Sequence, residues 1–156
     1  MKATTEDLIY ELSFRVRLLT EQRKASLSSM DLSETEELII DILDKKKRLN
    51  ITEIGKLIPS LKPSTISSMI SRLDKVKQLL SRQRSLEDER KVFVELSDKG
   101  KETLAQMKKA RYNIFNTIVT GLNLTPSKET VIREVINEAT GYFDNILQWK
   151  DENSKN

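Results

Sequence analysis

Residues that interrupt helices are scarce in this sequence, and that scarcity constrains the fold more than any other feature. The 156 residues include 4 Gly and 3 Pro, well below the roughly 12% that these two residues make up in average proteins. Glycine and proline end helices and begin turns. A chain with so few of them favours long helices joined by short connections.

Apolar spacing and capping signals place these helices along the chain. Ser33 and Glu36 form a capping box at the start of one helix, and Thr52 is positioned to cap the next. Thr125 with Pro126 begins the last helix, and Gly121 is a plausible C-terminal cap of the one before it. The basic run 45–48 is interpreted as a solvated turn that complements a helix dipole. The predicted helices cover residues 4–25, 33–44, 53–58, 63–77, 98–120 and 126–149.

Two short segments with alternating apolar residues predict a β-hairpin. They cover 79–84 and 91–96, with Val92, Val94 and Leu96 on one face of the second. Three short helices followed by a hairpin make a winged helix-turn-helix. The expected fold is therefore mainly α with a small β-hairpin wing. Its predicted parts are a winged-helix lobe over 33–97, long flanking helices in 1–32 and 98–150, and a disordered tail at 151–156.

The helix predicted at 63–77 has two distinct faces. Its apolar residues recur at the spacing of a core-facing stripe, and the opposite stripe is rich in hydroxyls. Because Ser and Thr are only middling helix formers, these hydroxyls point to contact with a partner, and short polar side chains suit the groove of a nucleic acid. An ordinary exposed face and a helix–helix contact through small residues remain the alternatives. The apolar stripe is Ile66, Met69, Ile70, Leu73 and Val76, and the polar stripe is Ser64, Ser67, Ser68, Ser71, Arg72 and Lys75, with Thr65 beside it.

Positive charge is concentrated just after the hydroxyl stripe. The formal net charge of the chain is only +3, but the segment 72–84 holds several cations and one acid, Asp74. Such side chains would supply affinity for phosphates that falls with salt, whereas a solvated basic hairpin without a partner is the alternative. The cations are Arg72, Lys75, Lys77, Arg82 and Arg84.

The hairpin connection holds both acids and bases, and two interpretations of it stay open. Asp88 can accept a hydrogen bond from Arg90 and orient its guanidinium toward a narrow minor groove. Alternatively, the two residues form a surface ion pair of little energetic value. Lys91, which follows directly at the start of the second strand, is a further candidate contact between the wing and DNA.

Missing residue types exclude several kinds of chemistry. The chain has no Cys and no His, which removes thiol chemistry and most transition-metal sites as well as the commonest general base. We find no Gly-rich phosphate loop and no nucleophile elbow, so an enzyme and a bound cofactor are not expected. The absence of a signal peptide or a long apolar run predicts a soluble, cytoplasmic protein without a membrane partner.

The segment 33–104 resembles the winged-helix core of the MarR family of prokaryotic transcription regulators, including its SarA-like members. The similarity is carried by Ile51–Ile54, by Lys62–Ser67, and by the wing segment Glu87–Val92 followed by Val94–Gly100. The resemblance implies a homodimer built from the terminal helices. It also implies helix 63–77 in the major groove and Arg90, positioned by Asp88, in the minor groove. Between the helix and the wing, 75–79 lacks the Gly common in the family and has one extra residue.

These observations lead to one expected function and one alternative. We expect a dimeric, sequence-specific regulator that binds double-stranded DNA at an inverted repeat, with repression as the expected effect. Ser64, Thr65, Ser67 and Ser68 would contact bases, and Arg72, Lys75, Arg82 and Arg84 phosphates. The family resemblance leaves room for a small organic effector, for which the sequence indicates no pocket residues. The alternative is a winged-helix module that binds a protein instead of DNA.

Overall fold

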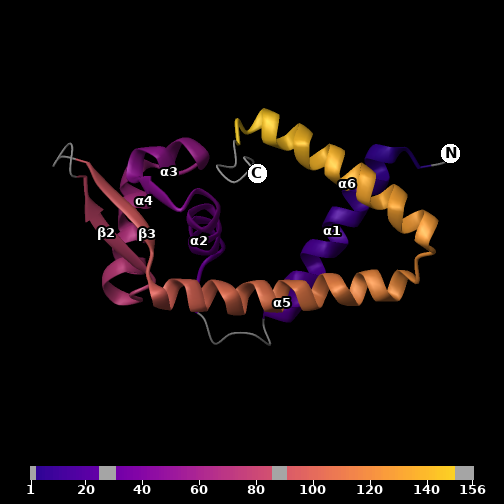
Figure 1. Ribbon diagram of the computed structural model, residues 1–156, viewed down its shortest axis with the longest axis horizontal. Coiled ribbons are helices and arrows are strands. Elements are labelled where there is room, and N and C mark those ends of the chain that lie inside the picture. The colour runs from indigo at the N-terminus through magenta and orange to yellow at the C-terminus, as the bar shows by residue number, and fades with distance from the viewer. Residues whose placement is uncertain (1–2, 25–30, 86–90, 150–156) are drawn as a thin grey trace.

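The computed structural model describes residues 3–24, 31–85 and 91–149. It consists of a lobe at one end and a frame of long helices at the other (Figure 1). The lobe holds helices α2 (Glu34–Lys46), α3 (Ile51–Leu57) and α4 (Pro63–Ser71) with strands β1 (Arg48–Asn50), β2 (Leu80–Arg84) and β3 (Val92–Leu96). The frame holds α1 (Thr5–Lys24), most of α5 (Asp98–Leu122) and α6 (Pro126–Ile146). This mainly helical winged-helix fold confirms the expected fold class.

Helix α5 connects the two parts of the molecule. It starts beside the sheet, runs along the base of the molecule to the far end, and is followed by α6, which turns back toward the lobe (Figure 1). Helix α1 crosses the far part of the frame. None of the described helices is long and apolar enough to cross a membrane. The predicted tail at 151–156 lies outside the described residues.

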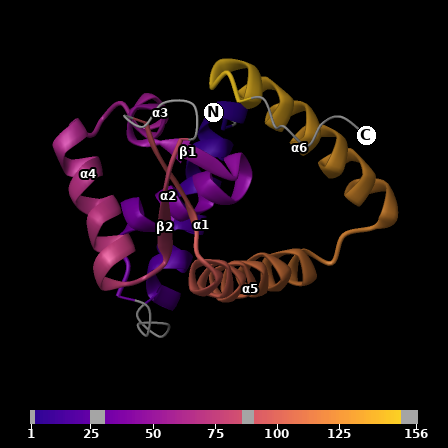
Figure 2. The same cartoon turned by 60° about the vertical axis from the view of Figure 1, so that its left-hand side comes forward.

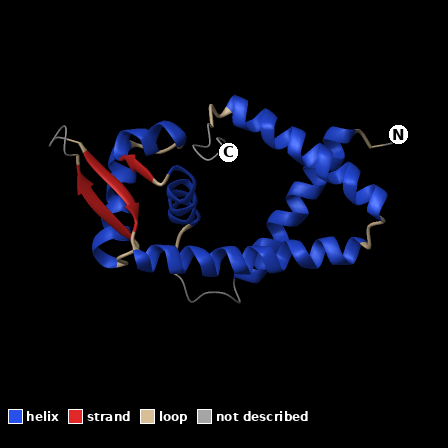
Figure 3. Ribbon diagram, viewed as in Figure 1, coloured by secondary structure: helices blue, strands red, loops and turns tan. Residues whose placement is uncertain are grey.

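The strands form an antiparallel sheet in the order β1-β3-β2 (Figure 3). Leu80 pairs with Leu96 and Arg84 with Val92, so the predicted hairpin is present, and each of its strands starts one residue later than expected. Strand β1 was not predicted, because three residues are too few to show an alternating pattern. It places Arg48 opposite Glu95. The turn predicted for 45–48 is therefore confined to Lys47, because Lys45 and Lys46 end α2 and Arg48 begins β1.

The hydrophobic core lies between α2, α3, α4 and the sheet. Gly100, in the first turn of α5, packs against the backbone of Leu79 so closely that a Cβ there would lie 2.0 Å from the Leu79 carbonyl oxygen. This contact fixes where α5 leaves the sheet. The most deeply buried apolar residues are Ile39, Ile40, Leu43, Ile54, Ile66, Ile70, Leu73 and Val94.

Several predicted helix details differ from the structure. Asn50, not Thr52, caps α3, and it forms a capping box with Glu53 because Asn50 Oδ1 accepts from the Glu53 amide at 2.9 Å. Helix α5 continues past Gly121 to Leu122, and Asn123 adopts the left-handed conformation of its C-terminal cap. Helix α6 ends at Ile146, three residues earlier than expected.

Candidate nucleic-acid interface

Helix α4 has its apolar face in the core and its hydroxyl face outward. Proline at the first helical position starts the helix, and Ile66 and Ile70 are fully buried. On the opposite side Ser64 and Ser68 are exposed, while Thr65 and Ser67 are partly exposed. Figure 2 shows α4 along one outer side of the lobe. The predicted opposition of the two faces is therefore confirmed for α4.

The last residue of the predicted apolar stripe does not belong to the core. Val76 is 74% exposed, although Leu73 is fully buried. The reason is a change of helix type: residues Arg72–Val76 form a π-helical turn, in which the Lys77 amide donates to the Arg72 carbonyl at 3.0 Å. The wider turn holds one residue more than an α-helical turn, so the apolar spacing fails at Val76.

The π-helical turn lies at the start of the segment in which the family resemblance implies an extra residue and no glycine, and it holds one residue more than an α-helical turn. Gln78 then adopts a φ of 58°, in the left-handed region that usually favours glycine. Its carbonyl accepts a hydrogen bond from Ser97 Oγ at 2.7 Å. The turn before β2 is thus made by a glutamine in a glycine-like conformation and held by the residue that caps α5.

Arg72, expected to contact phosphates, is engaged within the lobe. Its Nη2 donates to Asp31 Oδ2 at 3.2 Å, and its Nη1 lies 3.6 Å from Glu36 Oε1. Glu36 is 1% exposed, and its Oε1 accepts no hydrogen bond within the described structure. The guanidinium therefore compensates a buried carboxylate, because an isolated charge in the interior is costly.

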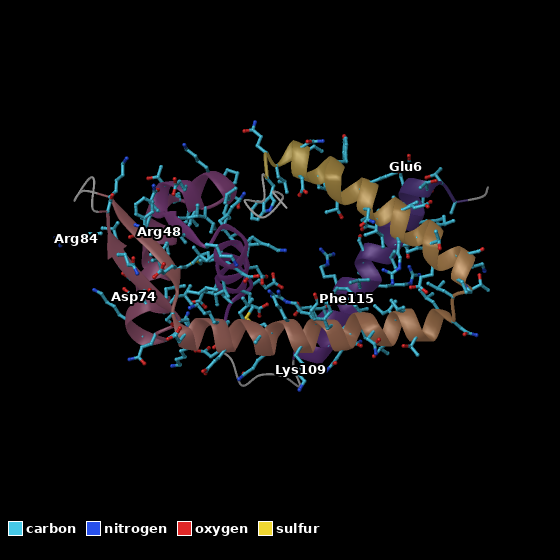
Figure 4. All side chains as sticks on the ribbon, viewed as in Figure 1. Glu6, Arg48, Asp74, Arg84, Lys109 and Phe115 are labelled. Atoms are coloured by element: carbon cyan, nitrogen blue, oxygen red, sulfur yellow. The ribbon has the colours of Figure 1, made fainter. Side chains whose placement is uncertain are left out.

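Lys77 and Arg82 are also held by acids. Lys77 is largely buried and donates to the backbone and carboxylate of Asp31. This hydrogen bond, together with the charges of Lys77 and Arg72, holds the pKa of Asp31 below its usual value. Arg82 Nε lies 2.9 Å from Asp74 Oδ2, and its Nη2 donates to Ser71 Oγ at 2.8 Å. These contacts link β2 to the last residue of α4 and to the π-helical turn that follows it (Figure 4, where Asp74 is labelled).

The remaining predicted cations are exposed. Lys75, Arg84 and Lys91 make no ion pair with another described residue. Figure 4 places Arg84 at the outer edge of the lobe, at the end of β2. The Ser85 amide donates to the Lys91 carbonyl at 2.9 Å and closes the described base of the hairpin. Exposed cations thus flank the hydroxyl face of α4 both at its end and at the base of the wing.

Asp88 and Arg90 lie outside the described residues. Their assignment to the minor groove therefore stays a prediction. What the structure contributes is the hairpin register, because Arg84 pairs with Val92 and fixes where the connection between the strands starts and ends.

Sequence analysis missed a basic residue on the outer face of the sheet. The guanidinium carbon of Arg48 lies 4.3 Å from the centre of the Phe93 ring, a cation–π contact. Beside it, Gln83 Nε2 donates to Glu95 Oε1 at 2.5 Å. These residues alternate with the buried ones along β3, and that period-2 pattern was the available signal for Phe93 and Glu95.

Comparisons with known proteins agree with this geometry. The family model described as transcriptional regulator SarA/Rot matches residues 22–107, which is more than half of the chain. Among curated proteins, no sequence matches. Several solved structures share the fold at low sequence identity.

The first of these structures is wild-type MarR from E. coli in its apo form, with a TM-score of 0.68 and 16% identity, covering 89% of this chain and 98% of that one. FabT from Streptococcus pneumoniae in complex with DNA has a TM-score of 0.66 and 19% identity, covering 88% and 94%. A mutant of MepR from S. aureus bound to an oligodeoxyribonucleotide has a TM-score of 0.58 and 17% identity, covering 91% and 99%.

Proposed function

This chain belongs to the SarA/Rot family of transcriptional regulators, and on that premise we propose that it binds double-stranded DNA as a homodimer at an inverted-repeat operator. The proposed effect is repression, because a dimer seated across two half-sites would exclude other proteins from that stretch of duplex. The lobe over 33–97 is the proposed DNA-binding part, and 1–32 with 98–150 the proposed dimerisation region.

The orientation of α4 is the observation that carries this proposal. A helix that enters a major groove needs one face anchored in its own domain and the other face slim and able to donate and accept hydrogen bonds. Ile66 and Ile70 supply the anchor, while Ser64 and Ser68 are exposed on the other face. Thr65 and Ser67, at the edges of that face, are the other proposed base contacts.

The charges of the lobe support different roles for different cations. Lys75, Arg84 and Lys91 are exposed beside α4 and the wing, so we assign them to phosphates. Arg72 and Arg82 have carboxylate partners. Each would contact a phosphate only if its guanidinium bound the phosphate together with the carboxylate, or released the carboxylate first. Asp88 and Arg90 keep their proposed role in the minor groove.

Exposed apolar faces on the frame support the homodimer. Helix α6 has no buried residue among those described. Exposed apolar side chains also occur on α1 and on the far half of α5. Burial of such faces by a second copy would remove a large apolar area from water. The exposed apolar residues include Leu8, Leu12, Phe115, Val119, Val131, Val135, Ile136, Tyr142 and Phe143.

Two relatives support DNA as the partner. The FabT structure is a complex with DNA, and the MepR mutant is bound to an oligodeoxyribonucleotide. A small organic effector stays part of the proposal without assigned residues. The competing function is a winged-helix module that docks on protein, which would show no salt-dependent affinity for any duplex.

Selection of bound duplexes from random DNA at two ionic strengths tests the proposal. We expect an enriched inverted repeat with half-sites about one helical turn apart, and light scattering should give the mass of two chains. Lys75→Ala should reduce the slope of log affinity against log salt by about one unit for every duplex. Lys128→Ala, a change of an exposed cation on α6, is the control and should leave the slope unchanged. Equal slopes in both variants would contradict the phosphate assignment of Lys75.

A further inference from the structure

The chain contains one tryptophan, Trp149, and it lies where the frame returns to the lobe. It lies three residues after the end of α6, and its amide donates to the Asp144 carbonyl at 2.7 Å, which turns the chain at the helix end. Gln148, just before it, adopts a left-handed φ of 50°. This turn brings the ring out of the line of α6 and toward the lobe.

Trp149 contacts the lobe in two ways. It is partly buried and packs against the hydrophobic core of the lobe. In addition, the Nζ of Lys46, the last residue of α2, lies 4.4 Å from the centre of the ring. A cation at this distance is attracted by the negative face of an aromatic ring. Apolar packing and a cation–π contact therefore hold the ring against the end of α2.

Through this contact the chain returns to the lobe after α5 and α6 have led away from it. The two helices leave the sheet, turn at the far end of the frame, and come back so that the end of α6 points toward the lobe (Figure 1), where Trp149 makes the contact. Within the described residues that follow α5, Trp149 is the apolar residue that packs on the lobe core. The frame is thus attached to the lobe at both ends of the α5–α6 unit.

We infer that Trp149 is a positioning residue for DNA binding, which acts by fixing the orientation of the lobe relative to the frame. The inference rests on the proposed function, since the frame would hold two lobes in a dimer. The separation of the two recognition helices then depends on the angle between each lobe and its frame. With Trp149 docked, that angle has one value, and the dimer discriminates among operators by half-site spacing. Without the contact, the lobes sample several spacings, and the population competent for any one operator falls.

The first arm of the test measures the contact itself through the fluorescence of Trp149. Lys46→Met removes the cation and Lys45→Met removes an equal charge from the exposed neighbouring residue. We expect Lys46→Met to shift the emission to longer wavelength and to increase quenching by acrylamide, and Lys45→Met to change neither. Identical spectra for the two variants would overturn the docked position of the ring.

The second arm measures the consequence for DNA. Selected operators are remade with one base pair added to or removed from the spacer, and their affinities are compared for wild type, Trp149→Ala and Trp149→Phe. We expect Trp149→Ala to bind the selected spacing about fivefold more weakly and to lose most of the preference over the altered spacings. Trp149→Phe, which keeps an aromatic ring, should recover part of that preference.

The outcomes separate the two proposals. If wild type binds operators and Trp149→Ala keeps the same spacing preference, the positioning role is wrong and the proposed function stands. If wild type binds no duplex, both are wrong. Circular dichroism shows whether Trp149→Ala is folded, and Trp149→Phe provides the same comparison should the alanine variant unfold.

Discussion

Arg111 of α5 donates two hydrogen bonds to the carboxylate of Asp41 on α2, at 2.9 and 2.7 Å. A third goes to Glu37 on the same helix at 3.0 Å, and Lys108 reaches Asp44 at 2.6 Å one turn earlier on α5. Desolvation by itself lowers the pKa of Arg111, but the bonds and charges of Asp41 and Glu37 outweigh it and raise the pKa above its usual value. Charged contacts therefore join α2 of the lobe to the middle of the connecting helix α5.

Loss of Arg111 should weaken the fold more than loss of an ordinary surface arginine. Arg111→Met leaves two half-buried carboxylates without their shared donor, so we expect the free energy of unfolding in urea to fall by about 2 kcal/mol. Arg133→Met removes an arginine that is 73% exposed and paired within α6, and should change it by under about 0.5 kcal/mol. Both are measured at one protein concentration, because the stability of the proposed dimer would depend on it. Equal losses would show that the Arg111 contacts contribute nothing specific.

Alanine at Gly100 should be strongly destabilising. The added Cβ would lie 2.0 Å from the Leu79 carbonyl oxygen, so α5 or the start of β2 would have to move. We expect a loss of about 3 kcal/mol in unfolding free energy. Gly55→Ala is the matched control: its Cβ would meet only Ile66 Cδ1, at 3.5 Å, and helix propensity favours alanine by up to about 1 kcal/mol. A Gly100→Ala protein as stable as wild type would contradict the close packing of α5 on Leu79.

Glycine at position 78 should stabilise the protein. Gln78 has a φ of 58°, and a left-handed conformation costs a residue with a side chain roughly 1–2 kcal/mol. Greater freedom of the unfolded chain offsets part of this gain, so Gln78→Gly should raise the unfolding free energy by about 0.5 kcal/mol. Gln106→Gly makes the same change at an exposed position inside α5 and should lower it by about 1 kcal/mol. Thermal unfolding of the two variants would show shifts of opposite sign.

Asp31 should contribute to stability in a pH-dependent way. Because Lys77 and Arg72 lower its pKa in the folded state, the contribution is present above the usual aspartate pKa and is lost as pH falls through the lower, folded value. The stability difference between wild type and Asp31→Asn should therefore be largest near neutral pH and shrink under acid conditions. Urea unfolding between pH 7 and pH 3 measures it, with Glu102→Gln as a control for net charge. A difference that grows in acid would contradict the assigned direction.

Local patterns in the sequence were sufficient for most elements of the fold. The capping box at Ser33, the proline that begins α4 and the alternating residues of the hairpin act within a few residues, so they can be identified from the sequence alone. Strand β1 could not be, because its three residues are a strand only through pairing with β3. Asn50 and Thr52 have similar propensities for the N-cap position, so the sequence does not distinguish them, and the backbone geometry makes Asn50 the cap of α3.

The candidate interface was predictable in its faces but not in its charge pairs. The hydroxyl and apolar stripes of α4 follow from helical spacing. The partners of Arg72 and Lys77 do not, because Asp31 lies 41 and 46 residues away along the chain. A count of cations near the recognition helix therefore overstates the positive charge available to DNA. Exposure and ion pairing together single out Lys75, Arg84 and Lys91.

The π-helical turn at 72–76 also bears on how any sequence with one residue fewer between α4 and β2 would be aligned with this chain. The gap belongs inside that turn, where the backbone takes up the additional residue locally. A gap placed instead in the connection at 86–90 would shift every position of β2 by one. Since neighbouring residues of a strand face opposite ways, that error would exchange Arg82, which pairs with Asp74, for a residue of the other face of the sheet.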